Sequence, residues 1–426
     1  MHSKCRQTTK SCLGSPLFNV RYQIIMLAVF LSIFLDLVGF GIILPLLPFY
    51  AEHYGATAFM VTWLATSFSL FQLIFSTIWG RVSDRIGRKP VFLMCLAVSA
   101  GAYLWTGLAE SFAVLIVARC VSGIASGKIS VAQAIVADVT TPENRAKGMG
   151  LMGAAFGLGF TLGPAIGAFL VGNDPQNPDF QTPMFVAAGL SLLGLLLALF
   201  TVKESLTAED RATARETTKL PLKTQLQAIF ASPSIPWLIG SFFIVSFVFS
   251  QVETLFPLWT ERNYGWQPKD LGYCFAYIGV ILVIVQGRLI GPLTQKLGEP
   301  KLLLVGLSAL AIGLFSTTVA FHFSIFIAAI TFMSVGIAIL NPTHSALISF
   351  VSAKGQQGST LGIANSFSGL GRILGPLWGG AFFEFVDYDM PLIIGGVLTV
   401  IFLIFVRRVV ISLADKNTAN KEKAPL

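Results

Sequence analysis

Five charged side chains interrupt long apolar runs of this sequence: Asp36, Arg119, Lys128, Glu253 and Arg372. A charge in the middle of a bilayer costs at least about 2.5–3.5 kcal/mol, so such residues mark ion or substrate pathways by default. A buried carboxylate can also carry a proton, because burial raises its pKa and a nearby cation lowers it again. These residue types in this setting predict proton transfer coupled to the movement of a solute.

The composition places these charges in a membrane protein. The chain has 426 residues, of which 54% are hydrophobic and 12% charged, whereas soluble domains are about 25% charged. Its 40 Gly and 20 Pro suit membrane helices, in which both are frequent. A soluble enzyme is therefore excluded. A nucleic-acid-binding protein is excluded as well, although the net charge is +8.

The apolar runs predict an all-α polytopic membrane protein with twelve transmembrane helices. Each run is near the 20 residues that a span needs, and none alternates as a barrel strand does. The predicted spans are 23–47, 58–79, 91–109, 113–136, 149–171, 183–202, 235–259, 270–288, 302–320, 323–350, 361–384 and 391–406.

The basic residues predict the orientation of the chain. Of the 29 Lys and Arg, 24 fall on the side of the two termini and only Arg262 and Lys269 on the other. Positive charge is retained inside, so both termini are expected in the cytoplasm, and the +8 charge implies no partner. The polar first 22 residues are not read as a signal peptide. The expected location is the cytoplasmic membrane, with an organelle membrane as the alternative.

The sequence repeats itself at a spacing of about 212 residues. GLGFTLGPAIG at 157–167 matches GLGRILGPLWG at 369–379. A repeat of six spans predicts two parallel six-helix bundles with a site between them. The predicted units are a tail (1–22), an N-terminal bundle (23–202), a linker (203–234), a C-terminal bundle (235–410) and a second tail (411–426). Within the linker, apolar residues at helical spacing favour an amphipathic surface helix or, equally, a solvated one: Leu222, Leu226, Ile229 and Phe230.

The in-span charges all fall in helices expected to line a cavity, because spans 3, 6, 9 and 12 contain none. Asp36 is the first candidate for proton coupling, with Arg119 as its tuning partner; the alternative is a structural ion pair of these two. Glu253 is the second candidate for proton coupling. The alternatives are that it lies in an outer vestibule or pairs with Arg372. With Lys128, the cavity holds three cations and two acids, which hints at an anionic or zwitterionic substrate.

A short polar loop, GRVSDRIGRKP at 80–90, joins spans 2 and 3. Its glycines are expected to allow close approach of helices and backbone, and its Asp to accept from helix amides or Arg. The basic side chains are expected to hold the loop inside and meet phospholipid head groups. The candidate gating residues are Gly80, Asp84, Arg85, Gly87, Arg88 and Lys89.

Glycines at a spacing of four residues form a face in span 5 and again in span 11. Such faces permit close helix packing, and a proline within them bends the helix. We expect both faces to seal against a helix of the other bundle, with ordinary packing as the alternative. The residues are Gly159, Gly163, Pro164 and Gly167, and then Gly371, Gly375, Gly379 and Pro376.

These motifs resemble those of the major facilitator superfamily. The 80–90 loop is similar to its signature loop, ARCVSGIASG at 118–127 to its fourth-helix arginine motif, and GFTLGPAIG at 159–167 to the fifth-helix motif of its antiporter branch. From residue 23 to 410 the chain looks like the tetracycline/proton antiporters. The resemblance implies that the loop latches the bundles on the inner side, unless it is only a topological anchor. It also implies export driven by a proton gradient without a cofactor, by a chain that works as a monomer.

The leading hypothesis is a proton-coupled exporter of small amphipathic organic compounds. The alternatives are a transporter of one dedicated metabolite, organic anion or metal chelator, and a membrane receptor or scaffold without flux. No nucleotide-binding loop, catalytic constellation or metal-ligand spacing is found, so neither an enzyme nor an ATP-driven pump is predicted. The expected partners are a small-molecule substrate, protons and membrane lipid.

Overall fold

The described residues form long helices and contain no strand. The computed structural model describes residues 16–140, 142–172, 174, 177–206, 227, 229, 232–352 and 357–422. The first half comprises α2 (Pro16–Ile43), α3 (Leu47–His53), α4 (Ala58–Ile86), α5 (Arg88–Gly107), α6 (Phe112–Ser126), α7 (Lys128–Val139), α8 (Pro142–Leu170) and α9 (Gln181–Thr201). The second half comprises α12 (Ile235–Tyr264), α13 (Pro268–Ile284), the π-helix η1 (Val285–Leu289), α14 (Ile290–Thr318), α15 (Phe323–Val351), α16 (Gln357–Phe385) and α17 (Met390–Glu422).

These helices confirm the all-α polytopic fold, with two local differences from the predicted spans. The fourth span is divided at Gly127 into α6 and α7. The eighth and ninth spans form one helical run, Pro268–Thr318, which turns sharply where Gly298 has φ 74° and ψ 153°. Within the described ranges, ten segments can cross a membrane by length and hydropathy, including this double one but not α16, which begins with a polar, glycine-rich stretch.

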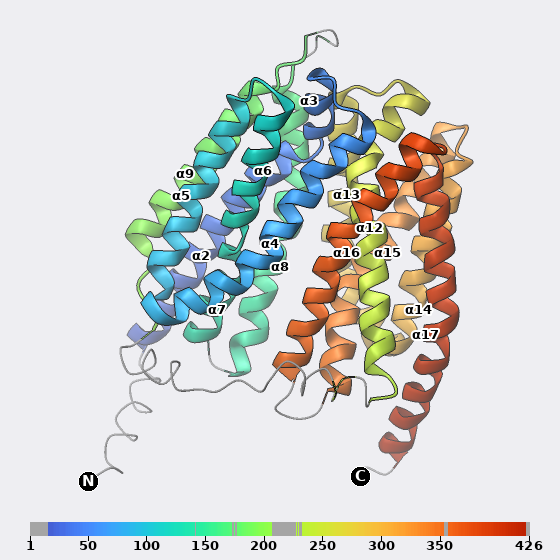
Figure 1. Ribbon diagram of the computed structural model, residues 1–426. Coiled ribbons are helices and arrows are strands. Elements are labelled where there is room, and N and C mark those ends of the chain that lie inside the picture. The colour runs from blue at the N-terminus through green and yellow to red at the C-terminus, as the bar shows by residue number, and fades with distance from the viewer. Residues whose placement is uncertain are drawn as a thin grey trace.

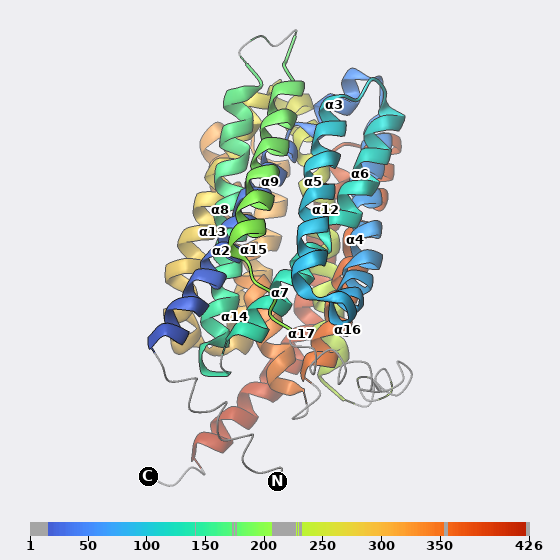
Figure 2. The same ribbon diagram turned by 90° about the vertical axis from the view of Figure 1, so that its left-hand side faces the viewer.

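The two halves lie side by side with their helix ends at two faces (Figure 1). We call the face where α2 begins and α17 ends the terminal face, and the opposite one, which carries α3, the distal face. Figure 2 shows the same arrangement from the side of the first half. The location of the terminal face in the cytoplasm stays a prediction.

The packing within each half follows the internal repeat. In the first half α2 packs against α8 and α9, and in the second half α12 packs against α16 and α17. Between the halves, α4 packs against α16 and α8 against α13. The limits of the predicted bundles stay predictions. In the predicted linker helix Ile229 is buried, whereas Leu222, Leu226 and Phe230 lie outside the described residues.

The halves are joined most firmly toward the distal face. The largest cluster of buried apolar residues combines Ile43 and Leu64 of the first half with Leu255 and Phe256 of the second. A second cluster, which contains Ile33 among others, draws all its buried members from the first half. Helices in lipid are held together by close van der Waals packing, so the distal ends form the tighter junction between halves.

Two carboxyl groups reinforce this distal junction. The amide of Ala58, at the start of α4, donates to Glu384 Oε2 of α16 at 3.1 Å. The side chain of Glu52, in α3, lies close to that of Glu261 in α12. Burial, followed by the proximity of Glu261, raises the pKa of Glu52 to about 8. A neutral Glu52 carboxyl thus favours contact between the halves here.

The predicted packing of the glycine faces against the opposite half is wrong. A methyl group added at Gly163 would lie 2.6 Å from the Cα of Gly41, in α2 of the same half. Likewise, one added at Gly371 would lie 2.6 Å from the carbonyl oxygen of Phe243, in α12. Both faces therefore serve packing within a half. The contact between halves uses Gly279, whose added methyl would meet Thr161 of α8.

Candidate functional site

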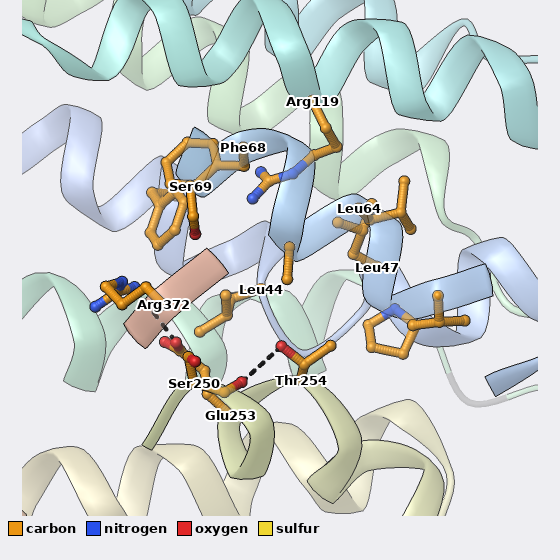
Figure 3. Close-up of a pocket in the computed structure, with 14 residues that line it drawn as sticks. Leu44, Leu47, Leu64, Phe68, Ser69, Arg119, Ser250, Glu253, Thr254 and Arg372 are labelled. Carbon is orange, nitrogen blue, oxygen red and sulfur yellow. Dashed lines mark hydrogen bonds and ion pairs between the residues drawn. The ribbon is translucent and has the colours of Figure 1, made fainter. Parts of the chain in front are cut away.

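A cavity lies between the halves and is lined mainly by the first half. In this conformation its volume is about 40 Å³. Its walls are mostly apolar, with two guanidinium groups and one carboxylate (Figure 3). Few polar groups in an apolar cleft are typical of a small-molecule site. The lining residues are Phe40, Leu44, Leu47, Pro48, Val61, Leu64, Ala65, Phe68, Ser69, Arg119, Ser250, Glu253, Thr254 and Arg372.

Glu253 and Arg372 form an ion pair at the wall of this cavity. Arg372 Nη2 lies 3.4 Å from Glu253 Oε2, and Figure 3 marks the contact. The Glu253 side chain is 8% exposed and that of Arg372 32% exposed. Glu253 Oε1 and Arg372 Nε are buried and have no hydrogen-bond partner in the described part of the chain. The long single contact leaves both groups free to take another partner, and the pairing considered for Glu253 is confirmed.

Arg119 enters the cavity from α6 and forms no ion pair with an acidic residue among those that the structure describes. It is 3% exposed, and its guanidinium carbon lies 4.4 Å from the ring centre of Phe68 and 5.7 Å from that of Phe40. Its Nε is buried and makes no hydrogen bond to a described residue. Aromatic faces stabilise a desolvated cation by about 2 kcal/mol, which offsets only part of the cost of burial. An anion entering the cavity would find this group available.

Asp36 pairs with Lys128, so the predicted pairing with Arg119 is wrong. Lys128 Nζ lies 2.7 Å from Asp36 Oδ2, and both side chains are at most 4% exposed. Lys128 also donates to Ser99 Oγ, while Ser191 Oγ donates to Asp36 Oδ1 at 2.8 Å. This cluster lies within the first half, among α2, α5, α7 and α9. Asp36 and Lys128 are not among the residues that line the cavity.

Lys128 follows directly on an interruption of helix 4. The helix stops at Ser126 and restarts at Lys128, after Gly127. Lys128 is 3% exposed and meets Asp36 inside the first half, so it does not extend along the helix to the membrane surface.

The gating loop is held by ion pairs within the first half. Arg88 lies 2.7 Å from Asp84 and 3.2 Å from Asp138 of α7, and it donates to Ser83 Oγ. Glu204 accepts from the amide of Arg88 at 2.9 Å, and so caps the start of α5. Among the described residues, no ion pair connects this loop to the second half. A latch between the halves stays a proposal for another conformation.

The two glycines of the loop differ in purpose. Gly87 has φ 115° and ψ 153°, a conformation that L residues avoid, and it turns the chain from α4 into α5. A methyl group at Gly80 would meet nothing within 4 Å, so the expected close approach is wrong there. Arg85 is exposed, and Lys89 Nζ donates to the Leu199 carbonyl.

Sequence patterns did not identify three residues that complete these sites. Ser99 and Ser191 occur in spans without charges, which gave them no distinguishing signal. Trp79, at the end of α4, donates through its indole nitrogen to the Ile124 carbonyl at 2.8 Å. A tryptophan next to the gating loop could have been noted, but its partner 45 residues away could not.

Comparisons with known proteins agree with this architecture. The family model described as Major Facilitator Superfamily matches residues 29–290 and 288–426. Multidrug resistance protein 2 of Bacillus subtilis (strain 168) is 30% identical over 87% of this chain and 91% of its own length. Tetracycline resistance protein, class B, of Escherichia coli is 29% identical over 80% of this chain and 84% of its own.

Solved structures show the same fold. The crystal structure of the human organic anion transporter MFSD10 (TETRAN) has a TM-score of 0.70 at 24% identity, covering 90% of this chain and 99% of its own. A bacterial homolog to the human lysosomal transporter Spinster, in an inward-facing and unoccupied conformation, has a TM-score of 0.71 at 16% identity, with 97% and 100% covered.

Proposed function

Because the chain belongs to the Major Facilitator Superfamily and is a transporter rather than an enzyme, we propose that it is a proton-coupled antiporter that exports small amphipathic organic compounds. The observation that carries the proposal is Glu253, a buried carboxylate at the wall of an apolar cavity between the halves. The names of the multidrug and tetracycline resistance relatives support export of drug-like compounds.

The Glu253–Arg372 pair supplies a means of coupling. When Glu253 is ionised, Arg372 stabilises it across 3.4 Å. A substrate whose cationic group binds Glu253 and whose negative group binds Arg372 favours an ionised Glu253 and displaces its proton, while protonation of Glu253 weakens the binding of that substrate. Substrate and proton thereby influence each other at one site, and by linkage the effect is reciprocal.

The charges of the cavity favour substrates that carry a negative group. Lys128 and Asp36 neutralise each other inside the first half, which leaves Arg119 and Arg372 opposite Glu253. The three cations and two acids expected from the sequence thus reduce to two cations and one acid. This observation favours, as a second candidate function, transport of organic anions, the activity named for the human relative of similar fold.

Asp36 remains a second candidate for proton coupling. Its carboxylate is balanced by the Lys128 ammonium group and the Ser191 hydroxyl, so protonation would leave Lys128 as an uncompensated buried charge. A buried pair of this kind responds to protonation by rearranging, without direct contact with substrate.

We also propose where and in what form the protein works. Its location is the cytoplasmic membrane, with both termini in the cytoplasm. It uses the proton gradient and no cofactor, and one chain is the functional unit.

Inside-out vesicles with an acidic lumen test the proposal. Tetracycline, norfloxacin and ethidium cover zwitterionic and cationic amphipathic probes. Wild type is expected to accumulate at least one of them, and Glu253→Gln to lose gradient-driven accumulation while it still exchanges labelled for unlabelled probe. The control is Glu110→Gln, which changes an exposed carboxylate between α5 and α6.

Two outcomes would contradict the proposal. Accumulation by Glu253→Gln at the wild-type rate would remove Glu253 and leave Asp36 as the coupling residue. Absence of gradient-driven movement in wild type, for every probe and for an added anionic dye, would favour the receptor or scaffold alternative.

A further inference from the structure

We propose that α7 is a lever that links the buried Asp36–Lys128 pair to the gating loop, and that Trp79 is the positioning residue at its pivot. It rests on the second candidate for proton coupling under the proposed function, because it assumes that Asp36 is neutral at one stage. Figure 2 shows α7 as a separate segment toward the terminal face, apart from α6, which reaches the distal face.

The pivot is the interruption of helix 4 at Gly127. In an unbroken helix the Ile124 carbonyl would accept from the amide of residue 128. Here the Trp79 indole donates to that carbonyl at 2.8 Å. A side chain inserted into the ladder of helix hydrogen bonds is a recognised cause of bending. Trp79 thus satisfies the carbonyl at the point where the helix can hinge.

Close packing keeps the pivot in place. A methyl group added at Gly127 would lie 3.0 Å from the carbonyl oxygen of Phe75, in α4. The same methyl would overlap the Trp79 indole. The pivot is thus a small residue that packs closely against one turn of α4, immediately before the gating loop begins at Gly80.

The two ends of α7 hold the two sites. At its first residue, Lys128 lies 2.7 Å from Asp36. At its other end, Asp138 lies 3.2 Å from Arg88 and accepts from Ser205 Oγ at 2.9 Å. Ten residues separate Lys128 from Asp138, so the lever spans about 15 Å.

Between its ends α7 behaves as one body. Its buried face packs into the apolar cluster of the first half through Val131, Ala132, Ile135 and Val136. A short helix with a continuous apolar face moves as a unit, because packed cores shift between discrete arrangements rather than deform.

The consequence is a connection between a charge and a gate. Loss of the Asp36 charge leaves Lys128 with only the Ser99 hydroxyl among its described partners. The ammonium group must then move toward water or another anion, because an unpaired buried charge is costly. Rotation of α7 about Gly127 also moves Asp138 and weakens its ion pair with Arg88.

Amide hydrogen exchange in lipid nanodiscs tests this connection without any substrate. Asp36→Asn is expected to speed exchange in peptides covering residues 80–90 by at least about fivefold, the lower range of coupling between linked sites. Trp79→Phe keeps an aromatic ring but removes the indole donor. In a protein that already carries Trp79→Phe, Asp36→Asn should no longer change amide hydrogen exchange in the gating loop.

The matched control is Trp63→Phe, which changes an exposed tryptophan of the same helix. It should leave the effect of Asp36→Asn intact. Faster exchange confined to the surroundings of Lys128, with the loop as in wild type, would overturn the proposal. So would an effect of Asp36→Asn that survives Trp79→Phe. Failure of drug transport would show in the vesicle assay and would leave this exchange measurement unaffected.

Discussion

The two halves share a backbone plan but differ in how they treat buried polar groups. The first half keeps a charged pair, Asp36 and Lys128, among four of its helices. The second half keeps a neutral pair instead, in which Ser241 Oγ lies 2.5 Å from His344 Nε2. Both pairs join the first and fourth helices of their half, and both are almost completely buried.

The protonation of His344 follows from its partners. Its Nδ1 lies 2.9 Å from the Leu340 carbonyl oxygen, which can only accept, so Nδ1 carries the proton. Complete burial disfavours the charged ring, so Nε2 accepts from the Ser241 hydroxyl and the ring is neutral. It also stacks on Phe242, with ring centres 5.1 Å apart. At this position the second half therefore joins its first and fourth helices without a charge.

The loops at the terminal face repeat the same contrast. Gly87 of the first half and Gly298 of the second, 211 residues later, both have positive φ. Where the first loop has Asp84 and Arg88, the second has Gln295 and Glu299. Both loops therefore make the turn at a glycine, but the second loop lacks the two residues that form the Asp84–Arg88 ion pair. Charge inside a half thus belongs to the first, whereas the second contributes Glu253 and Arg372 to the shared cavity.

The largest effect is expected from breaking the charged pair on one side. Lys128→Met keeps the length of the side chain but leaves Asp36 buried and unpaired, which costs about 3–5 kcal/mol of stability. Thermal unfolding in detergent should show this loss. Adding Asp36→Asn to the same protein should restore most of it. Equal destabilisation by Lys128→Met and by the double variant would contradict a specific pair.

Breaking the neutral pair should cost less. Ser241→Ala removes the donor to His344 Nε2 and leaves a buried acceptor unsatisfied, at about 1–3 kcal/mol. The same unfolding assay measures it, with Ser345→Ala, an exposed serine of α15, as control. A loss as large as that of Lys128→Met would mean that His344 is charged and that the contrast between the halves is wrong.

The junction of the halves should respond to pH through Glu52. Its pKa is about 8 in this arrangement and returns toward 4.5 when the distal ends separate. The closed junction therefore binds a proton that the open one releases between these values. Closure is fully favoured below about pH 4.5 and weakens as pH rises toward 8. Spin labels at Glu110 and Asn263 should report longer distances as pH rises, and Glu52→Gln should remove the dependence.

The smallest effect is expected where the second loop is made to resemble the first. Gln295→Asp adds a carboxylate to an exposed loop whose neighbour in the place of Arg88 is Glu299. The new carboxylate cannot form an ion pair with Glu299, so the free energy of unfolding should change by less than about 0.5 kcal/mol. Gain of more than about 1 kcal/mol on unfolding in detergent would show that the second loop has a cation available.

The sequence predicted the helices and the charges better than the partners. Span lengths and the 212-residue repeat depend on local composition, and α2–α17 agree with them. Which face of a helix meets its neighbour depends on packing over long separations. Asp36 pairs with Lys128, which lies next to a one-residue break at Gly127, and the glycines of α8 pack against their own half. Both arrangements depend on such long-range packing. Spacing alone contained neither fact.

The central claim is that substrate and proton meet at Glu253 in the shared cavity, rather than at the pair inside the first half. Purified protein in weakly buffered detergent solution tests it by proton uptake or release on addition of tetracycline, whose binding is followed by tryptophan quenching in the same sample. Wild type and Asp36→Asn should both exchange protons on binding, and Glu253→Gln should bind without exchange. Proton exchange that persists in Glu253→Gln and disappears in Asp36→Asn would contradict the account.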